Sequence, residues 1–390
     1  ARRALGALLV VPAAWLMIEL VRSAEQLAGP WGLLGASQWQ AQVGRDLAAL
    51  GGTWLVSAVL VALNTAVALA LSRGPRAPVL IAAGALVGAA LAWSAAYSPP
   101  LGRTVTVAAV QPGPIVDTEA RFAASERLTG PLAGRDVDLV VWGESSVGAD
   151  LDARPDLAAR LATLSRQVGA PVLVNVDARP RADLGIRKSS VLVGPDGVLA
   201  RYDKMRLVPF GEYVPMRPLL GWLGRYTDVA AQDRVRGEEP VLMDVDGTRV
   251  GPLVCFESAF PDMTRALARA GADVVVVQSA TWTFQESWAP EQHASLAAMR
   301  AAESGRPVLH ATLTGQTAAF DAAGRPAGPP LPTDRTGSVV YELATASGRT
   351  PFVAAGDWVL LGAGAVLVVW LGRGAVRLSR GRGRRGGGSC

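Results

Sequence analysis

Cysteine and histidine, which form most disulfide and zinc sites, are scarce in this chain of 390 residues. The two cysteines are Cys255 and the terminal Cys390, so the sequence predicts no internal disulfide framework. The two histidines, His293 and His310, show no ligand spacing with a cysteine, so we expect no metal site. Nothing in the pattern implies a cofactor. Cys255 is therefore either an inert buried thiol or a nucleophile, and a lone cysteine is more typical of the former.

Charged residues are also few, at 18% of the chain against 50% hydrophobic residues, and the mean hydropathy of +0.27 is too high for a simple soluble enzyme. Long apolar blocks occupy about residues 4–21, 51–71, 79–97 and 352–372. Each is near the length of about 20 residues that crosses a bilayer as a helix. Buried core helices are the alternative, but four blocks around a polar middle favour membrane spans.

Positive charge predicts how these spans are oriented. Arginines precede the first block, lie in the short loop 72–76, and fill the tail 373–390, which contains no acidic residue. With these three segments in the cytoplasm, residues 98–351 form an extracytoplasmic domain of a multi-pass membrane protein. A basic tail beside a span is typical of a membrane anchor, so we expect no nucleic-acid partner. Because Ala1 stands inside an apolar pattern, we also expect that further spans precede it.

The polar middle of the chain alternates between strand and helix patterns, which indicates an α/β layered domain with its own core. Several apolar runs are continuous, as in strands buried on both faces. Gly194–Gly197 and Asp246-Gly247 are turn signals between paired strands. We expect helices at 118–128, capped by Asp117 or Thr118, and at 155–168, 261–270 and 290–304, and strands at 105–110, 137–142, 171–176, 189–193, 198–202, 241–245, 249–254, 273–278, 308–312, 317–321 and 337–341.

Three polar residues follow three of the expected strands. Glu144 comes after strand 137–142, Lys204 after strand 198–202, and Cys255 directly after strand 249–254. Each taken alone is typical of a surface charge, a helix cap or a core thiol. Strand ends at one edge of a sheet converge on a single crevice, however, so together they predict a site. A strand-to-helix turn also lifts a nucleophile clear of the sheet and leaves backbone N–H groups to face an oxyanion.

The segments around these residues resemble the Glu, Lys and Cys motifs of the nitrilase (carbon–nitrogen hydrolase) superfamily. The segments are Trp142–Glu144, Tyr202–Pro215 and Cys255–Glu257, of which the second is long and specific. With membrane spans on both sides, the chain resembles the apolipoprotein N-acyltransferase family over essentially its whole length. This resemblance implies an α-β-β-α sandwich inserted between transmembrane helices. The chain departs from the family pattern at Gly143, where proline is usual, and at Arg206, Phe256 and the loop 279–284.

The resemblance also implies roles for single residues. Glu144 is the expected general base, Cys255 the nucleophile, and Lys204 the group that holds the carboxylate and stabilises the oxyanion with the Phe256 N–H. A nearby cation is expected to shift the thiol toward thiolate. Glu212, in the Lys motif, is the expected supporting carboxylate. Glu257 is expected behind the site or against substrate. Trp222 belongs to the apolar loop 216–226, which is a candidate lid with Arg217 and Arg225 near phosphate groups. Trp282 belongs to the loop 279–284.

The expected reaction transfers an acyl chain from a phospholipid to the N-terminal amine of a diacylglyceryl-cysteine apolipoprotein, through a thioester on Cys255. A membrane-anchored amidase that uses the same residues is the main alternative. A non-catalytic membrane receptor is a weaker one, because the triad is intact. A papain-like Cys–His pair that includes His293 is also disfavoured, since His293 falls within a helical pattern.

Overall fold

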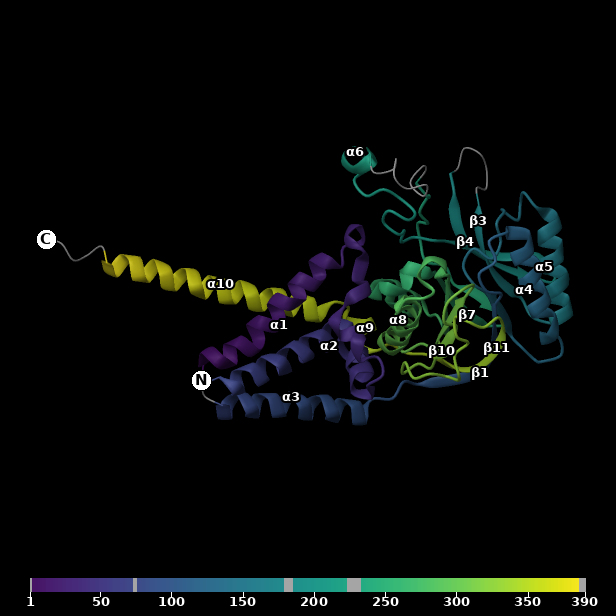
Figure 1. Ribbon diagram of the computed structural model, residues 1–390. Helices are drawn as coiled ribbons and strands as arrows, with labels where there is room; N and C mark the ends of the chain where they lie inside the picture. Colours follow the sequence, from purple (N-terminus) through teal and green to yellow (C-terminus); the bar gives the residue numbers. More distant parts are fainter. Residues whose placement is uncertain (1, 73–75, 179–184, 223–232, 386–390) are drawn as a thin grey trace.

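The structure is a computed structural model that describes residues 2–72, 76–178, 185–222 and 233–385. Long helices gather at one side of the molecule, and two β-sheets with their own helices form the other side (Figure 1). Three helices are long and apolar enough to cross a membrane: α1 (Arg2–Arg22), α2 (Gln42–Leu71) and α3 (Arg76–Ala96). The last helix, α10 (Trp358–Arg385), has a shorter apolar part, Trp358–Gly374.

Two of the expected spans have other limits in the structure. α2 begins at Gln42 rather than residue 51, and the helix breaks at Gly51 and Gly52, where the expected block starts. The block at 352–372 is likewise not one helix. A short α9 (Pro351–Ala355) ends at Gly356, whose φ is +69°, before α10 begins. Glycine adopts this left-handed conformation without the steric cost that other residues meet, so a helix can end there.

The domain between the spans contains two sheets. The first has the strand order β11-β1-β2-β3-β4-β5 and the second β10-β9-β8-β7-β6. Within the first sheet β1, β2 and β3 are parallel, and within the second β7, β8 and β9 are parallel. The strands are β1 (Leu101–Gln111), β2 (Leu139–Trp142), β3 (Val172–Ala178), β4 (Arg187–Gly194), β5 (Gly197–Asp203), β6 (Met243–Val245), β7 (Thr248–Val254), β8 (Val274–Ser279), β9 (Val308–Thr312), β10 (Ala318–Phe320) and β11 (Gly337–Ala346).

The two sheets face each other and each carries helices on its outer side, which confirms the expected α-β-β-α sandwich. Apolar side chains such as Val107 and Val276 fill the space between the sheets. α4 (Thr118–Thr129) and α5 (Pro155–Val168) cover the first sheet, and Asp117 caps α4 as expected. α7 (Pro261–Ala270) and α8 (Ala289–Ser304) cover the second sheet. The same apolar cluster continues from α7 and α8 into α1 and α2, so the membrane helices and the sandwich share one core.

Short helical turns complete the connections. Between α1 and α2 the chain forms η1 (Glu25–Leu27), η2 (Gly29–Gly32) and η3 (Leu34–Gln38), here called the interspan segment. The others are η4 (Gly130–Leu132), α6 (Arg217–Leu220), η7 (Cys255–Ala259) and η8 (Trp282–Phe284). α6 stands away from both sheets (Figure 1). Figure 1 therefore places α6 outside the sandwich. In contrast, η7 continues directly from the end of β7.

Candidate active site

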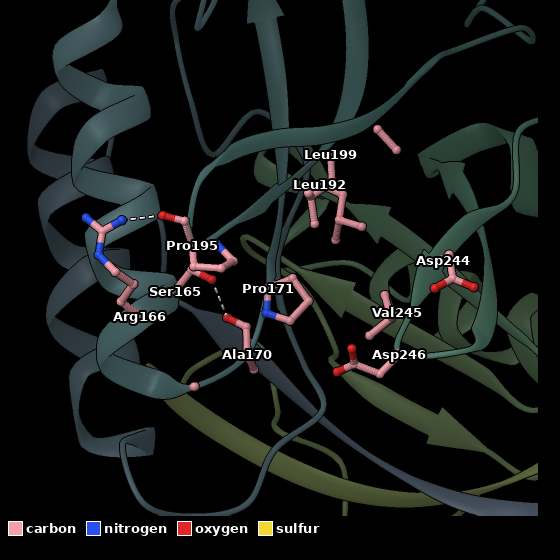
Figure 2. Close-up of a pocket in the computed structure, with 12 residues that line it drawn as sticks. Ser165, Arg166, Ala170, Pro171, Leu192, Pro195, Leu199, Asp244, Val245 and Asp246 are labelled. Atoms are coloured by element: carbon pink, nitrogen blue, oxygen red, sulfur yellow. Dashed lines mark hydrogen bonds between the residues drawn. The ribbon is translucent and has the colours of Figure 1, made fainter.

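A cavity of about 700 Å³ opens on the domain surface between α5 and two hairpins (Figure 2). Ala170 and Pro171 line it just before β3 begins, and Asp246 lies in the turn before β7. It therefore lies at the amino ends of these parallel strands. Because α/β sheets bind ligands outside the carboxyl ends of their strands, we place the site at the other end, where β2 precedes Glu144 and β7 precedes Cys255.

The nucleophile turn is strained at the residue that would react. Cys255 has φ +52°, a region that residues with a side chain rarely adopt and that costs about 1–3 kcal/mol. Its carbonyl oxygen accepts a hydrogen bond from Ser258 Oγ at 2.9 Å and lies 3.1 Å from His293 Nε2. These contacts hold the backbone in the conformation that turns β7 sharply into η7. The residue remains partly exposed, while its neighbours on both sides are buried.

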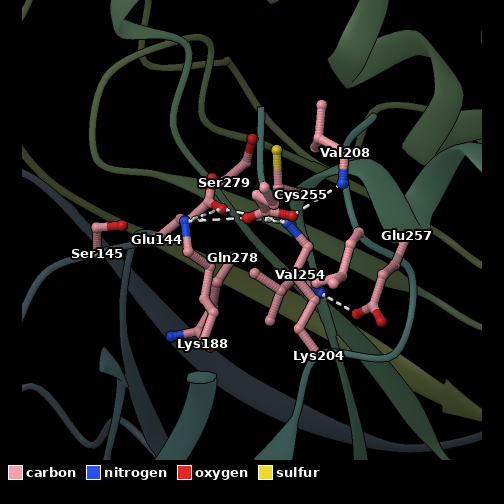
Figure 3. A network of polar contacts seen from close by, with 12 residues as sticks. Glu144, Ser145, Lys188, Lys204, Val208, Val254, Cys255, Glu257, Gln278 and Ser279 are labelled. Carbon is pink, nitrogen blue, oxygen red and sulfur yellow. Dashed lines mark hydrogen bonds and ion pairs between the residues drawn. The ribbon is translucent and has the colours of Figure 1, made fainter. Parts of the chain in front are cut away.

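Glu144 lies between two lysine ammonium groups (Figure 3). Its Oε1 accepts a hydrogen bond from Lys188 Nζ at 2.8 Å, and Lys204 Nζ is 3.6 Å from the same oxygen. The Glu144 backbone N–H donates to Ser279 O at 3.1 Å, which ties the end of β2 to the end of β8. The carboxylate is thus held between the two sheets, with its charge directed at two cations.

Glu212 is the second carboxylate of the network. Its Oε1 accepts from Lys204 Nζ at 3.0 Å, and its Oε2 accepts from the Val208 N–H at 2.9 Å. Burial alone would raise the pKa of Glu212, but Lys204 and Lys188 outweigh it and lower that pKa to about 2. The same two carboxylates, Glu212 and Glu144, outweigh burial at Lys204 and raise its pKa. Lys204 is therefore charged at neutral pH and is unsuited to act as a base.

The thiol differs from the expectation. Burial raises the pKa of Cys255 to about 12, and the negative charge of Glu144 adds to this effect. Lys204 and Lys188 act in the opposite direction but do not compensate. The cations therefore lower the pKa of the thiol, as expected, but burial outweighs them, and the net shift is away from thiolate. The resting thiol is protonated, and it needs a base to become a nucleophile.

Glu257 is fully buried behind the nucleophile turn. Its Oε1 accepts hydrogen bonds from Tyr202 Oη at 2.7 Å and from the Met205 and Arg206 N–H groups at 2.6 and 3.0 Å. Its Oε2 accepts from the Val254 N–H at 2.7 Å. The side chain therefore joins the loop that carries Lys204 to the strand that carries Cys255. Of the two positions expected for it, this is the one behind the site.

The interspan segment packs directly on the nucleophile turn. The rings of Phe256 and Phe260 meet edge to face at 5.0 Å, and a Cβ at Gly29 would lie 2.9 Å from Phe256 and 2.7 Å from Phe260. Only glycine fits there, and its φ of +63° requires glycine as well. Glu25 pairs with Arg206 at 3.3 Å, beside the Lys204 loop. A segment that joins two membrane helices thus supports both motifs of the site.

Two expected supporting residues, Trp222 and Trp282, are not among the residues labelled in the network of Figure 3. Trp222 is 56% exposed, two residues after the end of α6. Trp282 lies in η8, where the Arg121 guanidinium stands 5.2 Å from its ring centre. Arg217, expected near phosphate, binds the Asp233 carboxylate through Nε at 2.8 Å. Residues 223–226 of the expected lid, Arg225 included, lie outside the described residues.

The histidines take no part in a Cys–His pair within the described contacts. His293 Nδ1 lies 3.0 Å from Ser279 Oγ, and its Nε2 faces Ser258 Oγ and the Cys255 carbonyl rather than the thiol. Burial lowers the pKa of His293 to about 4 and that of His310 to about 3, so both are neutral at pH 7. Within the described ranges no group of three or more His, Cys, Asp and Glu residues is arranged to hold a metal ion.

Comparison with known proteins agrees with this geometry. The carbon-nitrogen hydrolase family model matches residues 106–349, and the apolipoprotein N-acyltransferase N-terminal domain model matches residues 1–66. The apolipoprotein N-acyltransferases of Pseudomonas paraeruginosa and Azotobacter vinelandii are each 32% identical to this chain. The alignments cover 95% and 93% of this chain, and 74% and 72% of the relatives. The chain belongs to the apolipoprotein N-acyltransferase family.

Solved structures show the same fold for the domain. A CN-hydrolase superfamily protein from Xanthomonas campestris superposes with a TM-score of 0.51 at 21% identity, over 66% of this chain and 98% of that one. A nitrilase-superfamily amidase from Nesterenkonia gives a TM-score of 0.50 at 21% identity, over 66% of this chain and 96% of that one. As a member of the apolipoprotein N-acyltransferase family, the chain is an N-acyltransferase and a bacterial membrane protein.

The departure at Gly143 has a steric cause in this member of the family. A Cβ at residue 143 would lie 2.0 Å from the Leu313 N and 2.4 Å from the Thr312 carbonyl carbon. The backbone after β9 therefore occupies the space that any other side chain would need. Glycine lets β2 and β9 approach closely, directly beside Glu144.

Lys188 is the residue of this polar network that sequence reasoning missed. It lies in β4, directly before the expected strand 189–193, where a lysine is typical of a solvated strand end. It is instead 7% exposed and makes the shortest contact with Glu144. The only signal in the sequence is its place three residues before the buried apolar run that begins at Val191. That signal is weak, because the alternation of polar and apolar residues along a strand does not show which face of the strand lies inside a domain of two sheets.

Proposed function

We propose that this enzyme transfers an acyl chain from a phospholipid to the N-terminal amine of the diacylglyceryl-cysteine of apolipoproteins, through a thioester on Cys255. The observation that carries the proposal is the buried contact of Glu144 with two ammonium groups beside a strained cysteine at a strand end. The names of the relatives supply the acceptor class, and membrane helices that share a core with the catalytic domain suit a lipid donor.

In the first half-reaction Glu144 takes the thiol proton as Cys255 Sγ attacks the ester carbonyl of the phospholipid. The S–C bond forms, and negative charge develops on the carbonyl oxygen. Lys204 and the Phe256 N–H stabilise this oxyanion. The C–O bond to the lysophospholipid then breaks, and Glu144 returns the proton to the leaving oxygen. Because the resting thiol has a raised pKa of about 12, the step depends on this base.

In the second half-reaction the free amine of the acceptor attacks the thioester. The N–C bond forms, Glu144 takes a proton from the amine, and the C–S bond breaks. The proton then returns to the Cys255 sulfur, which restores the resting pair. A thioester retains much of the transfer potential of the ester, so the amide forms without a cofactor or nucleotide. Positioned acid–base and oxyanion groups of this kind each contribute about 10²- to 10³-fold in rate.

The membrane arrangement is part of the proposal. The arginines of residues 2–3, 73–76 and 373–390 lie on the cytoplasmic side, and residues 98–351 lie outside. Residues 1–97 and 352–372 then form the membrane region of a multi-pass protein. Both substrates reach the site from the outer leaflet, and the exposed apolar side chains around α6, Leu219 and Trp222 among them, would contact lipid.

Hydrolysis of a small amide by the same residues is the second candidate. The sandwich and the network would serve either reaction. The match of residues 1–66 to the N-terminal domain of the acyltransferase family favours acyl transfer, because a small soluble substrate does not need a membrane domain.

The test incubates the full chain in detergent with phospholipid labelled in its acyl chain. We expect a hydroxylamine-sensitive adduct on the peptide that contains Cys255, and its loss when an acceptor lipopeptide is added. Cys255→Ala should abolish the adduct. Failure of the wild-type enzyme to form it, or an adduct that survives in Cys255→Ala, would contradict the proposal.

A further inference from the structure

Lys188 makes a closer contact with Glu144 than the lysine of the Lys motif does. Its Nζ donates to Glu144 Oε1 at 2.8 Å, whereas Lys204 Nζ is 3.6 Å from that atom. Lys204 in turn is 3.0 Å from Glu212 Oε1, and Lys188 is 3.5 Å from it. The two ammonium groups therefore divide the two carboxylates between them. Each lysine has one hydrogen-bonded glutamate and one more distant one.

The backbone fixes this division. The Lys204 N–H donates to the Lys188 carbonyl oxygen at 2.8 Å, so the two residues stay in register where β4 begins and β5 ends. On its other side β4 pairs with β3, which places Lys188 opposite Asp177 at 3.5 Å between Nζ and Oδ2. Lys188 is thus held from both neighbouring strands. Its side chain is 9% exposed, so water provides little screening of its charge.

The charges around Glu144 balance only when Lys188 is counted. Arg234 donates to Asp177, and its Nε lies 3.9 Å from Glu212 Oε1. Without Lys188, three carboxylates would share two cations, and Glu144 would lose the one cation that is hydrogen-bonded to it among the described residues. The titratable and charged groups that face Glu144 are Lys188 from β4, Asp177 from β3, Lys204 after β5, Glu212 and Arg234 from the segments that follow, and Cys255 from η7.

We propose that Lys188 is the counter-ion of the catalytic base, which holds the Glu144 carboxylate in place and leaves the Lys204 ammonium to stabilise the oxyanion. The inference rests on the proposed role of Glu144 as the base. Lys188 acts through Glu144 and touches no substrate, so it is a positioning residue. Lys188 lowers the pKa of Cys255, so its loss should raise that pKa and also remove the hydrogen-bonded cation from Glu144.

The test measures the rate of Cys255 alkylation by iodoacetamide between pH 5 and 9, on the full chain in detergent. Peptide mass spectrometry separates Cys255 from Cys390. In Lys188→Met we expect the acid limb of the pH profile to move up by about one unit or more, and the rate at pH 7 to fall about tenfold or more. Lys188→Arg, which keeps the charge, should retain the wild-type limb to within about half a unit.

Arg187→Met is the matched control. Arg187 is the neighbour of Lys188 on β4, but its guanidinium binds Asp203 at 2.8 Å, away from Glu144. Its loss should leave the pH profile unchanged. An unmoved acid limb in Lys188→Met overturns the proposal, whatever happens to the rate. An equal shift in Arg187→Met overturns it too, since the effect would then not be specific to Glu144.

A second variant covers loss of folding. If Lys188→Met does not give a cooperative melting transition, Lys188→Gln keeps a donor toward Glu144 without the charge. A raised acid limb in Lys188→Gln supports the counter-ion role, and a wild-type limb overturns it. Alkylation needs no phospholipid, so the two proposals fail separately. A wild-type enzyme with this pH behaviour but no acyl adduct contradicts the proposed function and leaves the role of Lys188 standing.

Discussion

Two buried glutamates, Glu144 and Glu257, belong to the candidate site, and their partners differ in kind. Glu257 accepts hydrogen bonds from the backbone of Val254, Met205 and Arg206 and from the Tyr202 hydroxyl. The side-chain contacts of Glu144 are instead with two lysine ammonium groups. Backbone donors are fixed in place, and they hold Glu257 in one position. Ammonium groups on long side chains can follow a carboxylate that gains and loses a proton.

The comparison teaches how one site uses the same side chain for two purposes. Glu257 accepts hydrogen bonds from N–H and O–H donors of two loops, so that residue is suited to joining them. Glu144 is instead bound by cations that Glu212 and Asp177 also neutralise. Burial is similar at both residues. The partners, rather than the burial, separate the proposed base from the proposed support.

The largest expected effect comes from Glu144→Gln. Loss of the base should slow formation of the acyl adduct by about 10²- to 10⁴-fold without loss of the fold. Because Glu144 raises the pKa of Cys255, the same change should lower that pKa, so thiolate appears at lower pH while acyl transfer falls. Labelled phospholipid and the pH profile of alkylation measure the two effects. Glu119→Gln, an exposed carboxylate on α4, is the control, and equal loss of transfer in both variants would break the comparison.

A smaller and different effect is expected from Glu257→Gln. The glutamine amide would place an NH₂ group where a carboxylate oxygen of Glu257 now accepts hydrogen bonds. Buried N–H groups would then lose their acceptor, which should destabilise the fold by about 1–3 kcal/mol. Misplacement of the Lys204 and Cys255 loops should slow acylation by roughly 10- to 100-fold. The acid limb of the pH profile should stay in place. A shifted limb, measured beside thermal unfolding, would show that Glu257 takes part in proton transfer.

The smallest effect is expected at a carboxylate far from the site. Asp117 caps α4 by accepting from the Ala120 N–H at 2.7 Å, on the outer face of the first sheet. Asp117→Ala should cost about 0.5–2 kcal/mol of stability, as loss of an N-cap does. Acyl transfer at a temperature well below unfolding should be unchanged. Reduced transfer at that temperature would mean that stability, rather than position at the site, governs the losses in the other variants.

Local patterns predicted most of the sandwich. The limits expected for the helices at 155–168 and 261–270 and for the strand at 308–312 are those of α5, α7 and β9. Proline at the start and glycine just after the end mark both helices, and these signals depend only on neighbouring residues. The breaks in α2 at Gly51-Gly52 and before α10 at Gly356 were missed. Hydropathy averages over such residues, while the structure uses them where Phe352 packs against Gly52.

The sequence by itself determined the order of strands and helices and placed Glu144, Lys204 and Cys255 at strand ends, because periodicity and turn residues act over a few positions. Only the tertiary structure decided that Lys188 binds Glu144 and that the thiol is protonated. Both depend on groups from β4, from η7 and from the strand ends of the two sheets, and these groups come together only when the sheets have packed. Coulomb energies and burial vary with distance in space, and spacing along the chain does not report them.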